Sequence, residues 1–214
     1  MSVQSRTMNH TMSRRAEMLT PGLRIGLLGG SFNPAHEGHL HLTRMCLRAL
    51  KLDRVWWLVS PQNPLKSAAG MASLDARLAS ARALAEKSGD PRIAVTALET
   101  RLGTRYTIDT VRALKARHPG IRFVWLMGAD NMLQLPRWAK WRQLTREIPL
   151  AVYPRSGVTL KARLSPAART LESVTLEASD AGLLADIAPP ALVFLEGREH
   201  PASATAIRAA RPRS

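Results

Sequence analysis

The sequence predicts an α/β fold in which helices cover both faces of a mainly parallel β-sheet. From residue 23 onward, short apolar runs of strand length alternate with stretches of helical spacing. This alternation is typical of parallel strands joined by crossover helices. In addition, the first apolar run leads directly into Gly29 and Gly30, where a strand passes into a helix. We therefore expect a doubly wound, Rossmann-like sheet whose binding groups lie in loops at the carboxyl ends of its strands.

The strands expected in this sheet are short and apolar. They cover residues 23–28, 55–59, 93–95, 121–127, 149–153 and 191–195. Helices are predicted over residues 38–50, 73–87 and 107–117, with a final helix that begins near residue 203. In the second of these helices, Leu74, Leu78, Ala81 and Leu84 or Ala85 share one face, and Ser73 is a suitable N-cap. Residues 155–190 are less regular, although 171–176 could form a strand and 183–187 a helical turn.

The chain is expected to form one domain over residues 21–214, preceded by a flexible extension over residues 1–20. The extension has no hydrophobic periodicity and ends before Pro21 and Gly22, which favour a turn. The rest of the chain is long enough to bury one substantial core, since 45% of the 214 residues are hydrophobic. Cys46 is the single cysteine, lies in an apolar stretch, and is expected to be a buried, inert thiol.

Composition narrows the class of partner. The net charge of +15 favours an anionic partner, but the basic residues are scattered and form no dense run. Small phosphates therefore fit this pattern better than nucleic acid does. No apolar run reaches the 18 or so residues of a membrane-spanning helix, and no secretory leader is evident, so a cytoplasmic protein without a membrane partner is expected.

The strongest candidate site is the segment GGSFNPAHEGH over residues 29–39. Its first residues, Gly29, Gly30, Ser31 and Phe32, form a loop whose glycines would let the backbone approach an anion and adopt conformations closed to other residues. His36 and His39 lie three positions apart. On the first turn of a helix they would project to the same side, where both can donate hydrogen bonds to one polyphosphate.

Other interpretations of this segment are weaker. It lacks the Gly-Lys-Ser/Thr ending of a P-loop, the GxGxxG fingerprint, and the His-Glu-x-x-His spacing of a zinc protease helix. His36, His39 and His41 could form a metal cluster, although no carboxylate or cysteine is well spaced to complete it. A helix start with incidental histidines is the remaining alternative.

The segment resembles the opening signature of the HxGH nucleotidyltransferases, and specifically of the bacterial nicotinate-nucleotide adenylyltransferases. Near the other end, SATAIR over residues 203–208 is similar to the family's SSTxIR element and retains Ser203, Thr205 and Arg208. Ala204 replaces the second serine of that element, and Asn33 stands where many members have Asp.

Three further segments are similar to elements of the nicotinate enzymes. SPQNPLK resembles a PNNPPHK loop and would place Lys66 near phosphates, although Leu65 stands where that loop has His. Tyr106 and Thr107 belong to RYTIDTV, which resembles SYTxDTL but also suits simple helix capping. Gly128-Ala129-Asp130 and the following PRW resemble the family's GxD and FPxW regions, so the resemblance implies that Trp138 stacks on a pyridine ring. Packing of Trp138 on Trp141 is the alternative.

The resemblance implies adenylyl transfer from ATP to nicotinate mononucleotide, which forms nicotinate adenine dinucleotide and pyrophosphate in NAD biosynthesis. It implies His36 and His39 as catalytic residues, Mg²⁺ as the cofactor that accompanies ATP, and no metal held by protein side chains alone. The implied ATP-binding residues are Gly29, Gly30, Ser31, Phe32, His36, His39, Gly128, Asp130, Ser203, Thr205 and Arg208. The implied mononucleotide-binding residues are Lys66, Tyr106, Thr107 and Trp138. Rival functions are another adenylyl or cytidylyl transfer on the same scaffold and an RNA- or DNA-binding module.

Overall fold

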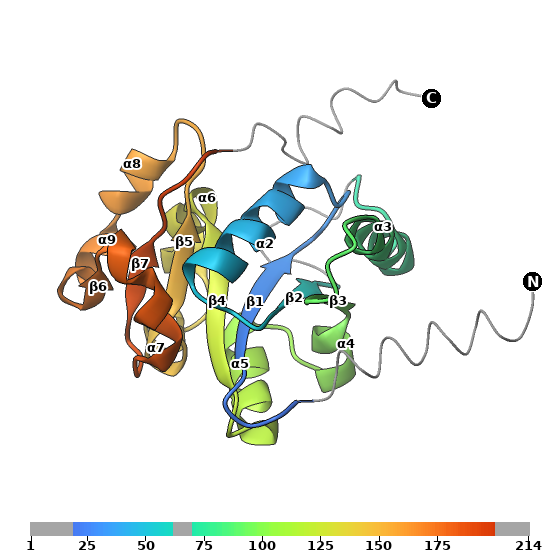
Figure 1. Cartoon of the computed structure of the whole chain (residues 1–214), viewed down its shortest axis with the longest axis horizontal. Helices are drawn as coiled ribbons and strands as arrows, with labels where there is room; N and C mark the ends of the chain where they lie inside the picture. Colours follow the sequence, from blue (N-terminus) through green and yellow to red (C-terminus); the bar gives the residue numbers. More distant parts are fainter. Residues whose placement is uncertain (1–18, 62–69, 200–214) are drawn as a thin grey trace, which may run out of the picture.

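A parallel sheet organises the part of the chain that the computed structural model describes, residues 19–61 and 70–199 (Figure 1). Its strands run in the order β3-β2-β1-β4-β5-β7-β6, and all adjacent pairs are parallel. The strands are β1 (Arg24–Gly30), β2 (Arg54–Val59), β3 (Ile93–Thr96), β4 (Arg122–Gly128), β5 (Leu150–Tyr153), β6 (Thr175–Leu176) and β7 (Leu192–Phe194). Strand order reverses between β1 and β4, so this doubly wound sheet opens a crevice at their carboxyl ends.

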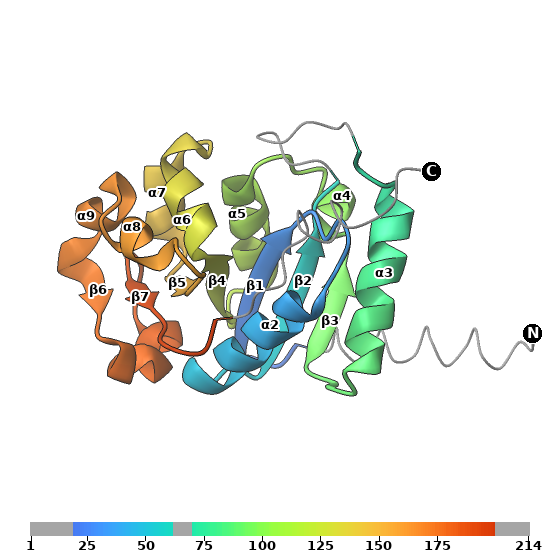
Figure 2. The same ribbon diagram turned by 90° about the horizontal axis from the view of Figure 1, so that it is seen from above.

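Helices cover both faces of the sheet, as the sequence predicts (Figure 2). The α-helices are α2 (Glu37–Ala49), α3 (Leu74–Lys87), α4 (Leu98–Leu102), α5 (Thr107–Arg117), α6 (Ala129–Gln134), α7 (Trp141–Glu147), α8 (Thr159–Arg163) and α9 (Pro166–Thr170). The 3₁₀ segments are η1 (Leu135–Arg137), η2 (Glu172–Val174) and η3 (Ala178–Asp186). Strand side chains alternate between two apolar clusters: Leu126 packs with α2, α3 and η3, whereas Trp125 packs with α5, α6 and α7.

The strands and long helices predicted from the sequence are confirmed, with ends that differ by one or two residues. The possible strand over 171–176 is mostly wrong, because only Thr175 and Leu176 pair with β7 and a 3₁₀ turn precedes them. The helical turn expected over 183–187 is part of the longer segment η3. Leu19, within the expected extension, packs against the apolar cluster that contains Trp125. Residues 1–18 and the final helix expected near residue 203 lie outside the described residues.

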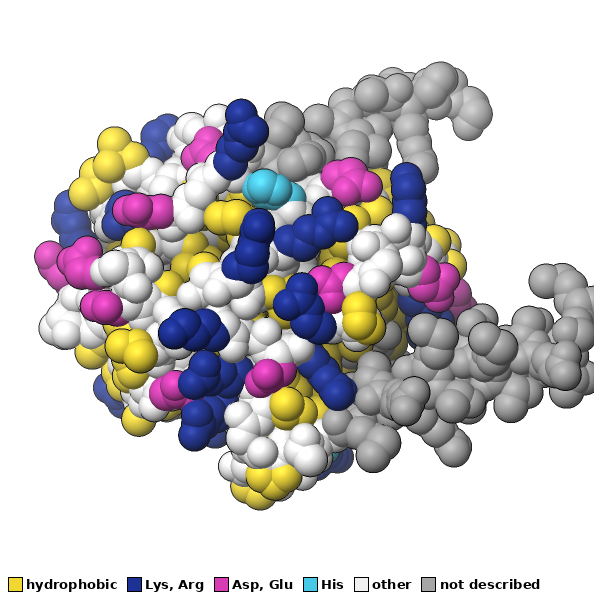
Figure 3. Space-filling view, viewed as in Figure 1, with side chains coloured by type: hydrophobic (Ala, Val, Ile, Leu, Met, Phe, Trp, Pro, Cys, Tyr) yellow, Lys and Arg dark blue, Asp and Glu magenta, His cyan; other side chains and the backbone are white. Residues whose placement is uncertain are grey.

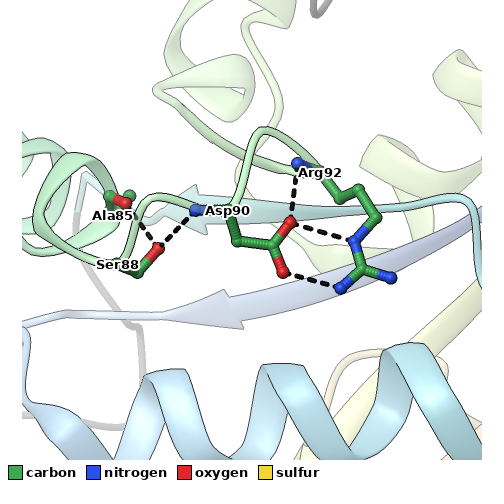
Figure 4. A network of polar contacts seen from close by, with 4 residues as sticks. All are labelled: Ala85, Ser88, Asp90 and Arg92. Carbon is green, nitrogen blue, oxygen red and sulfur yellow. Dashed lines mark hydrogen bonds and ion pairs between the residues drawn. The ribbon is translucent and has the colours of Figure 1, made fainter.

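Short-range polar contacts fix both ends of α3. At its start the Ser73 hydroxyl accepts a backbone N–H at 3.2 Å, which confirms the predicted N-cap. At its end the Ser88 hydroxyl donates to the Ala85 carbonyl at 2.6 Å and accepts from the Asp90 N–H at 3.2 Å (Figure 4). The Arg92 guanidinium binds both oxygens of Asp90, at 2.9 and 2.7 Å, and lowers the pKa of that carboxyl. These contacts set the turn that leads from α3 into β3.

Two further expectations concern the core and the membrane. Cys46 is fully buried, and burial raises the pKa of its thiol to about 12, in agreement with the inert thiol predicted from the sequence. Within residues 19–61 and 70–199, no helix combines the length and the apolar character needed to cross a membrane.

Gly29 leaves room beside the crevice for a buried side chain of the neighbouring strand β4. A Cβ atom at Gly29 would lie 2.7 Å from two carbons of the buried Trp125 ring, which is closer than real Cβ contacts allow. The six-membered edge of the indole therefore occupies the space that any other residue at this position would need for its side chain. The glycine requirement at position 29 comes from the packing of a neighbouring strand.

We expect Gly29→Ala to lower the free energy of unfolding by about 1–3 kcal/mol, because the added methyl overpacks a filled core against Trp125. Urea denaturation would measure the loss. Gly30→Ala is the matched control: its Cβ would lie 3.3 Å from the Phe32 ring, so a smaller loss is expected. Equal stability of Gly29→Ala and the unaltered chain would contradict this account.

Candidate functional site

A cavity of about 280 Å³ lies at the carboxyl ends of β1 and β2, next to β4. It is lined by six residues that the sequence singles out as binding residues, Gly29, Gly30, Ser31, Tyr106, Thr107 and Trp138. Residues from the end of β1, the start of α5 and the turn after η1 thus meet around one space. The placement agrees with the general rule that ligands of doubly wound sheets bind at this edge.

One wall of the cavity is aromatic. Trp138 follows η1 and packs edge-to-face on Trp125 of β4, with ring centroids 6.1 Å apart and an interplanar angle of 89°. The aromatic partner of Trp138 is therefore the strand residue Trp125, whereas helical spacing suggests Trp141. A flat aromatic wall suits a planar ring as ligand. Sequence reasoning missed Trp125, because a tryptophan within an apolar strand is expected to be core.

The cavity also carries charged groups that the sequence interpretation left out. Arg105, Arg137 and Glu99 line it together with Ser60, Asn131 and Ala139. Glu99 is only 7% exposed, and burial raises the pKa of its carboxyl, while a hydrogen bond from Ser60 opposes that rise. The signal for these residues was available: Arg105 and Arg137 each precede a predicted site residue, and Ser60 directly follows a predicted strand.

The two imidazoles predicted to act together lie side by side at the start of α2. His36 is the N-cap of the helix, and its ring centroid lies 3.9 Å from that of His39. The His36 backbone N–H donates to Nδ1 of His39 at 3.1 Å. In the neutral ring this bond leaves the hydrogen of His39 on Nε2, which makes Nε2 the donor. His36 is 7% exposed and His39 partly exposed, so the pair lies at the edge of the core.

Phe32 corrects the sequence interpretation of the glycine loop. Gly29 and Gly30 belong to the regular strand β1, and Phe32 is the residue of this loop with a left-handed backbone, at φ 47°. Its side chain is 1% exposed and packs between His39 and Trp57, with centroid distances of 4.6 and 5.3 Å. The Phe32 ring therefore supports His39 from the core, and only its backbone could meet a ligand.

A buried arginine joins the loops that follow β1 and β2. Arg77 of α3 is 2% exposed, and burial lowers the pKa of its guanidinium. Its Nη1 donates to the carbonyls of Ser31 at 2.8 Å and Ser60 at 2.7 Å. Its Nη2 donates to the Pro61 carbonyl at 2.9 Å, and its Nε to that of Ala72 at 3.0 Å. Because Ser31 and Ser60 both line the cavity, Arg77 fixes two of its walls.

Asn33 ties the same β1 loop to the segment before α3. Its amide donates to the Gly70 carbonyl at 3.1 Å and accepts from the Ala72 N–H at 3.3 Å. The side-chain amide is the donor in one contact and the acceptor in the other, and a carboxylate at this position could not fill both roles. The asparagine noted from the sequence thus has a structural role between two loops.

The remaining predicted residues lie around this centre. Gly128 is the N-cap of α6, and Asp130 lies in its first turn, with Oδ1 3.3 Å from Nε of Arg155. After β7, the carbonyl of Arg198 accepts from the Tyr153 hydroxyl at 2.7 Å and lies 2.6 Å from Nε2 of His41. The chain that leads toward the predicted C-terminal element therefore passes beside α2. Outside the described residues lie Lys66, Ser203, Thr205 and Arg208.

The described residues give no support to the metal-cluster alternative. Among residues 19–61 and 70–199, no three His, Cys, Asp or Glu side chains are placed to hold a metal ion. His41 instead contacts the Arg198 carbonyl and packs edge-on against Tyr153, with centroids 5.9 Å apart. His36 and His39 contact each other.

The chain is similar to known proteins over most of its length. The cytidylyltransferase-like family matches residues 27–210. The chain is 69% identical over 197 residues to a probable nicotinate-nucleotide adenylyltransferase of Parvibaculum lavamentivorans, covering 92% of this chain and 96% of that protein. It is 51% identical over 186 residues to one from Caulobacter sp. (strain K31), covering 87% of this chain and 97% of that protein.

Solved structures show the same fold. A Plasmodium falciparum nicotinic acid mononucleotide adenylyltransferase complexed with NaAD superposes with a TM-score of 0.56 at 19% identity, covering 67% of this chain and 72% of that chain. The same enzyme complexed with APC gives 0.55 at 18% identity, covering 67% and 71%. These likenesses extend the agreement from the sequence to the architecture of the sheet.

We expect Arg77→Met to cost about 3 kcal/mol or more of unfolding free energy, because it leaves four carbonyls without their donor. The same change should lower kcat/KM, since the walls formed by Ser31 and Ser60 lose their common tie. For Arg77→Lys, the free energy of unfolding and kcat/KM should fall between those of the parent and Arg77→Met, because an ammonium cannot reach all four acceptors. Arg82→Met, on the exposed side of the same helix, is the control; parity between Arg77→Met and Arg82→Met would refute the role.

We expect Glu99→Gln to raise the melting temperature at pH 8. Burial raises the pKa of Glu99, so the folded protein favours the protonated carboxyl, which glutamine mimics. The stability given by the protonated form is fully present below the ordinary glutamate pKa and is lost as pH rises through the raised pKa. The difference between variant and parent should therefore shrink toward pH 4. Exposed Glu172→Gln serves as control, and a pH-independent difference would contradict the argument.

Proposed function

This chain belongs to the nicotinate-nucleotide adenylyltransferase family, and from that premise we propose which of its residues transfer the adenylyl group of ATP to nicotinate mononucleotide. The products are nicotinate adenine dinucleotide and pyrophosphate. The observation that carries the proposal is that residues 29–31 join two half-sites, the aromatic cavity and the imidazole pair of His36 and His39. These residues line the aromatic cavity and lead directly into the loop that presents His36 and His39.

The cavity is assigned to the mononucleotide. Trp138 offers its ring to the pyridine, in an orientation fixed by its edge-to-face contact with Trp125. Tyr106 and Thr107 open the 11-residue helix α5, whose first backbone N–H groups and positive dipole end favour a carboxylate or phosphate. The cavity of about 280 Å³ is near the lower end of the range of small-molecule pockets.

The imidazole pair is assigned to the triphosphate. A 5′-phosphate oxygen of the mononucleotide attacks the α-phosphorus of ATP, and the bond from that phosphorus to the bridging oxygen of pyrophosphate breaks. Pyrophosphate leaves with the electron pair of that bond. Nε2–H of His39 and the adjacent His36 donate hydrogen bonds where negative charge builds on the bridging and leaving oxygens. The phosphate monoester is already largely ionised near neutral pH, so no protein nucleophile is required.

A divalent metal ion accompanies the reaction, and we assign it as Mg²⁺. We assign the contact with this ion to Asp130, which lies in the first turn of α6 directly after β4, has a carboxylate that is 43% exposed, and has its Oδ1 3.3 Å from Nε of Arg155. A single carboxylate fits Mg²⁺, which retains waters and takes its remaining ligands from substrate phosphates. When bound, the ion would neutralise charge on the phosphates, and the protein side chains would orient them.

Residues outside the described part complete the proposed site. The family resemblance assigns Lys66 to phosphates, and Ser203, Thr205 and Arg208 to the triphosphate. Support for the C-terminal group comes from Arg198, whose carbonyl is held beside α2 by Tyr153 and His41. Four residues lie between Arg198 and Ser203 in the sequence. Use of ATP as substrate also favours a cytoplasmic enzyme.

The surface gives less support to the rival nucleic-acid module. Lys and Arg side chains lie singly or in small groups over one face of the molecule, with Asp and Glu among them (Figure 3). Some arginines of the chain are engaged in ion pairs: Arg112 binds Glu147, and Arg24 binds Asp186. A nucleic-acid surface requires a continuous stripe of accessible positive charge.

The test of the proposed function is direct. The purified protein is incubated with ATP, Mg²⁺ and either nicotinate or nicotinamide mononucleotide, and products are identified by chromatography. Formation of nicotinate adenine dinucleotide with an equal amount of pyrophosphate is expected. Binding to duplex or single-stranded nucleic acid with a steep salt dependence, and no dinucleotide, would favour the rival.

We expect His39→Ala to lower kcat by about 10²-fold or more while the KM for the mononucleotide stays within a few-fold, because the lost donor acts on charge that develops during transfer. His118→Ala is the control, since His118 caps the far end of α5. Steady-state kinetics and a thermal melt of both variants provide the readouts. Unchanged turnover of a folded His39→Ala protein would refute the assigned role.

A further inference from the structure

We propose that Arg105 and Arg137 make the enzyme select the acid form of the pyridine mononucleotide over the amide form. The inference deepens the proposed function and rests on it. The two substrates differ only in the group on the ring: nicotinate mononucleotide carries a carboxylate there, and nicotinamide mononucleotide a neutral amide. A positive charge beside the ring therefore distinguishes them, whereas an aromatic wall alone cannot.

Both arginines line the cavity together with Trp138, the residue assigned to the pyridine ring. Arg105 directly precedes Tyr106 and Thr107, and Arg137 directly precedes Trp138. All of these residues line the same space as the Trp138 ring. The arginines come from two separate elements, the loop before α5 and the segment η1, and both line the same cavity.

Both arginines are available for a ligand. Each is exposed, and within the described part of the chain neither is paired with an acid. Other arginines are engaged in ion pairs, such as Arg92 with Asp90 at 2.7 Å. The guanidinium carbon of Arg105 lies 5.7 Å from the centroid of the Tyr106 ring. This cation–π contact orients the guanidinium without neutralising it.

The charge balance of the cavity points the same way. Among the described residues that line the cavity, Glu99 is the sole acid, and it is buried and bonded to Ser60. The two guanidiniums outnumber this one buried carboxyl, so the described lining of the cavity has a net positive charge. Arg105 is also a departure in this chain, because the SYTxDTL element that its surroundings resemble has serine at that position. A guanidinium at that position adds a charge-assisted donor that a serine does not supply.

The experiment uses the ratio of kcat/KM for nicotinate mononucleotide to that for nicotinamide mononucleotide, measured at saturating ATP. Both substrates share the 5′-phosphate, so any contribution of an arginine to phosphate binding cancels in the ratio. Arg105→Gln and Arg137→Gln should each lower the ratio about tenfold, in keeping with a hydrogen bond to a charged group, and the double variant should lower it further. Arg105→Lys, which retains the charge, should recover part of the loss.

The matched control is Arg142→Gln, since Arg142 lies 4.8 Å over the Trp141 ring and outside the cavity; its ratio should equal that of the parent. If the glutamine variants slow both substrates equally, or slow neither, the selectivity role is overturned while the proposed function stands. If the unaltered protein makes no dinucleotide from either mononucleotide, the proposed function fails and this inference with it. Thermal melts of each variant report folding separately.

Discussion

The site depends above all on the buried guanidinium of Arg77, which holds together loops that leave two different strands. A buried charge is costly unless its donors are satisfied, and here carbonyl oxygens accept from four of the five N–H groups of the guanidinium. The arrangement has two consequences. The loops after β1 and β2 are locked in one geometry, and the positive charge of Arg77 remains uncancelled beside a site built for anions. Structural support and electrostatic preorganisation are thus combined in one side chain.

The fold explains why the two half-sites share residues 29–31. In the order β3-β2-β1-β4, β1 lies at the centre, and its carboxyl end borders both β2 and β4. On one side the strand meets Trp125, whose ring occupies the space over Gly29 and supports Trp138. On the other side the chain turns at Phe32, which packs beneath His39. Aromatic side chains therefore position both the aromatic wall of the cavity and the imidazole pair from the core.

Sequence reasoning reached the fold because strands and long helices have clear periods, and it reached the motif residues because they are contiguous. It missed α4 and α6 to α9, which have five to seven residues each and too few turns to show a helical period. Arg77 escaped notice because it lies within a predicted helix among apolar neighbours, and Trp125 because a buried strand tryptophan looks like core. The convergence of Glu99 with Ser60 is a long-range contact that no local pattern encodes.

The chemistry asks the protein to bring two anions together, and the location of its positive charge matters more than the total. The net charge of +15 is spread over the chain, where salt screens it, and can at most speed the encounter with phosphates. Among the described residues, the groups that we propose to offset repulsion between a phosphate and a triphosphate are partly or fully withdrawn from solvent: the imidazole pair, Arg77 and the start of α5. Their donors are oriented before any ligand arrives, by Phe32, by the His36–His39 contact and by carbonyls of the loops. Because the dielectric around them is low, each contributes more per charge than the many surface arginines do.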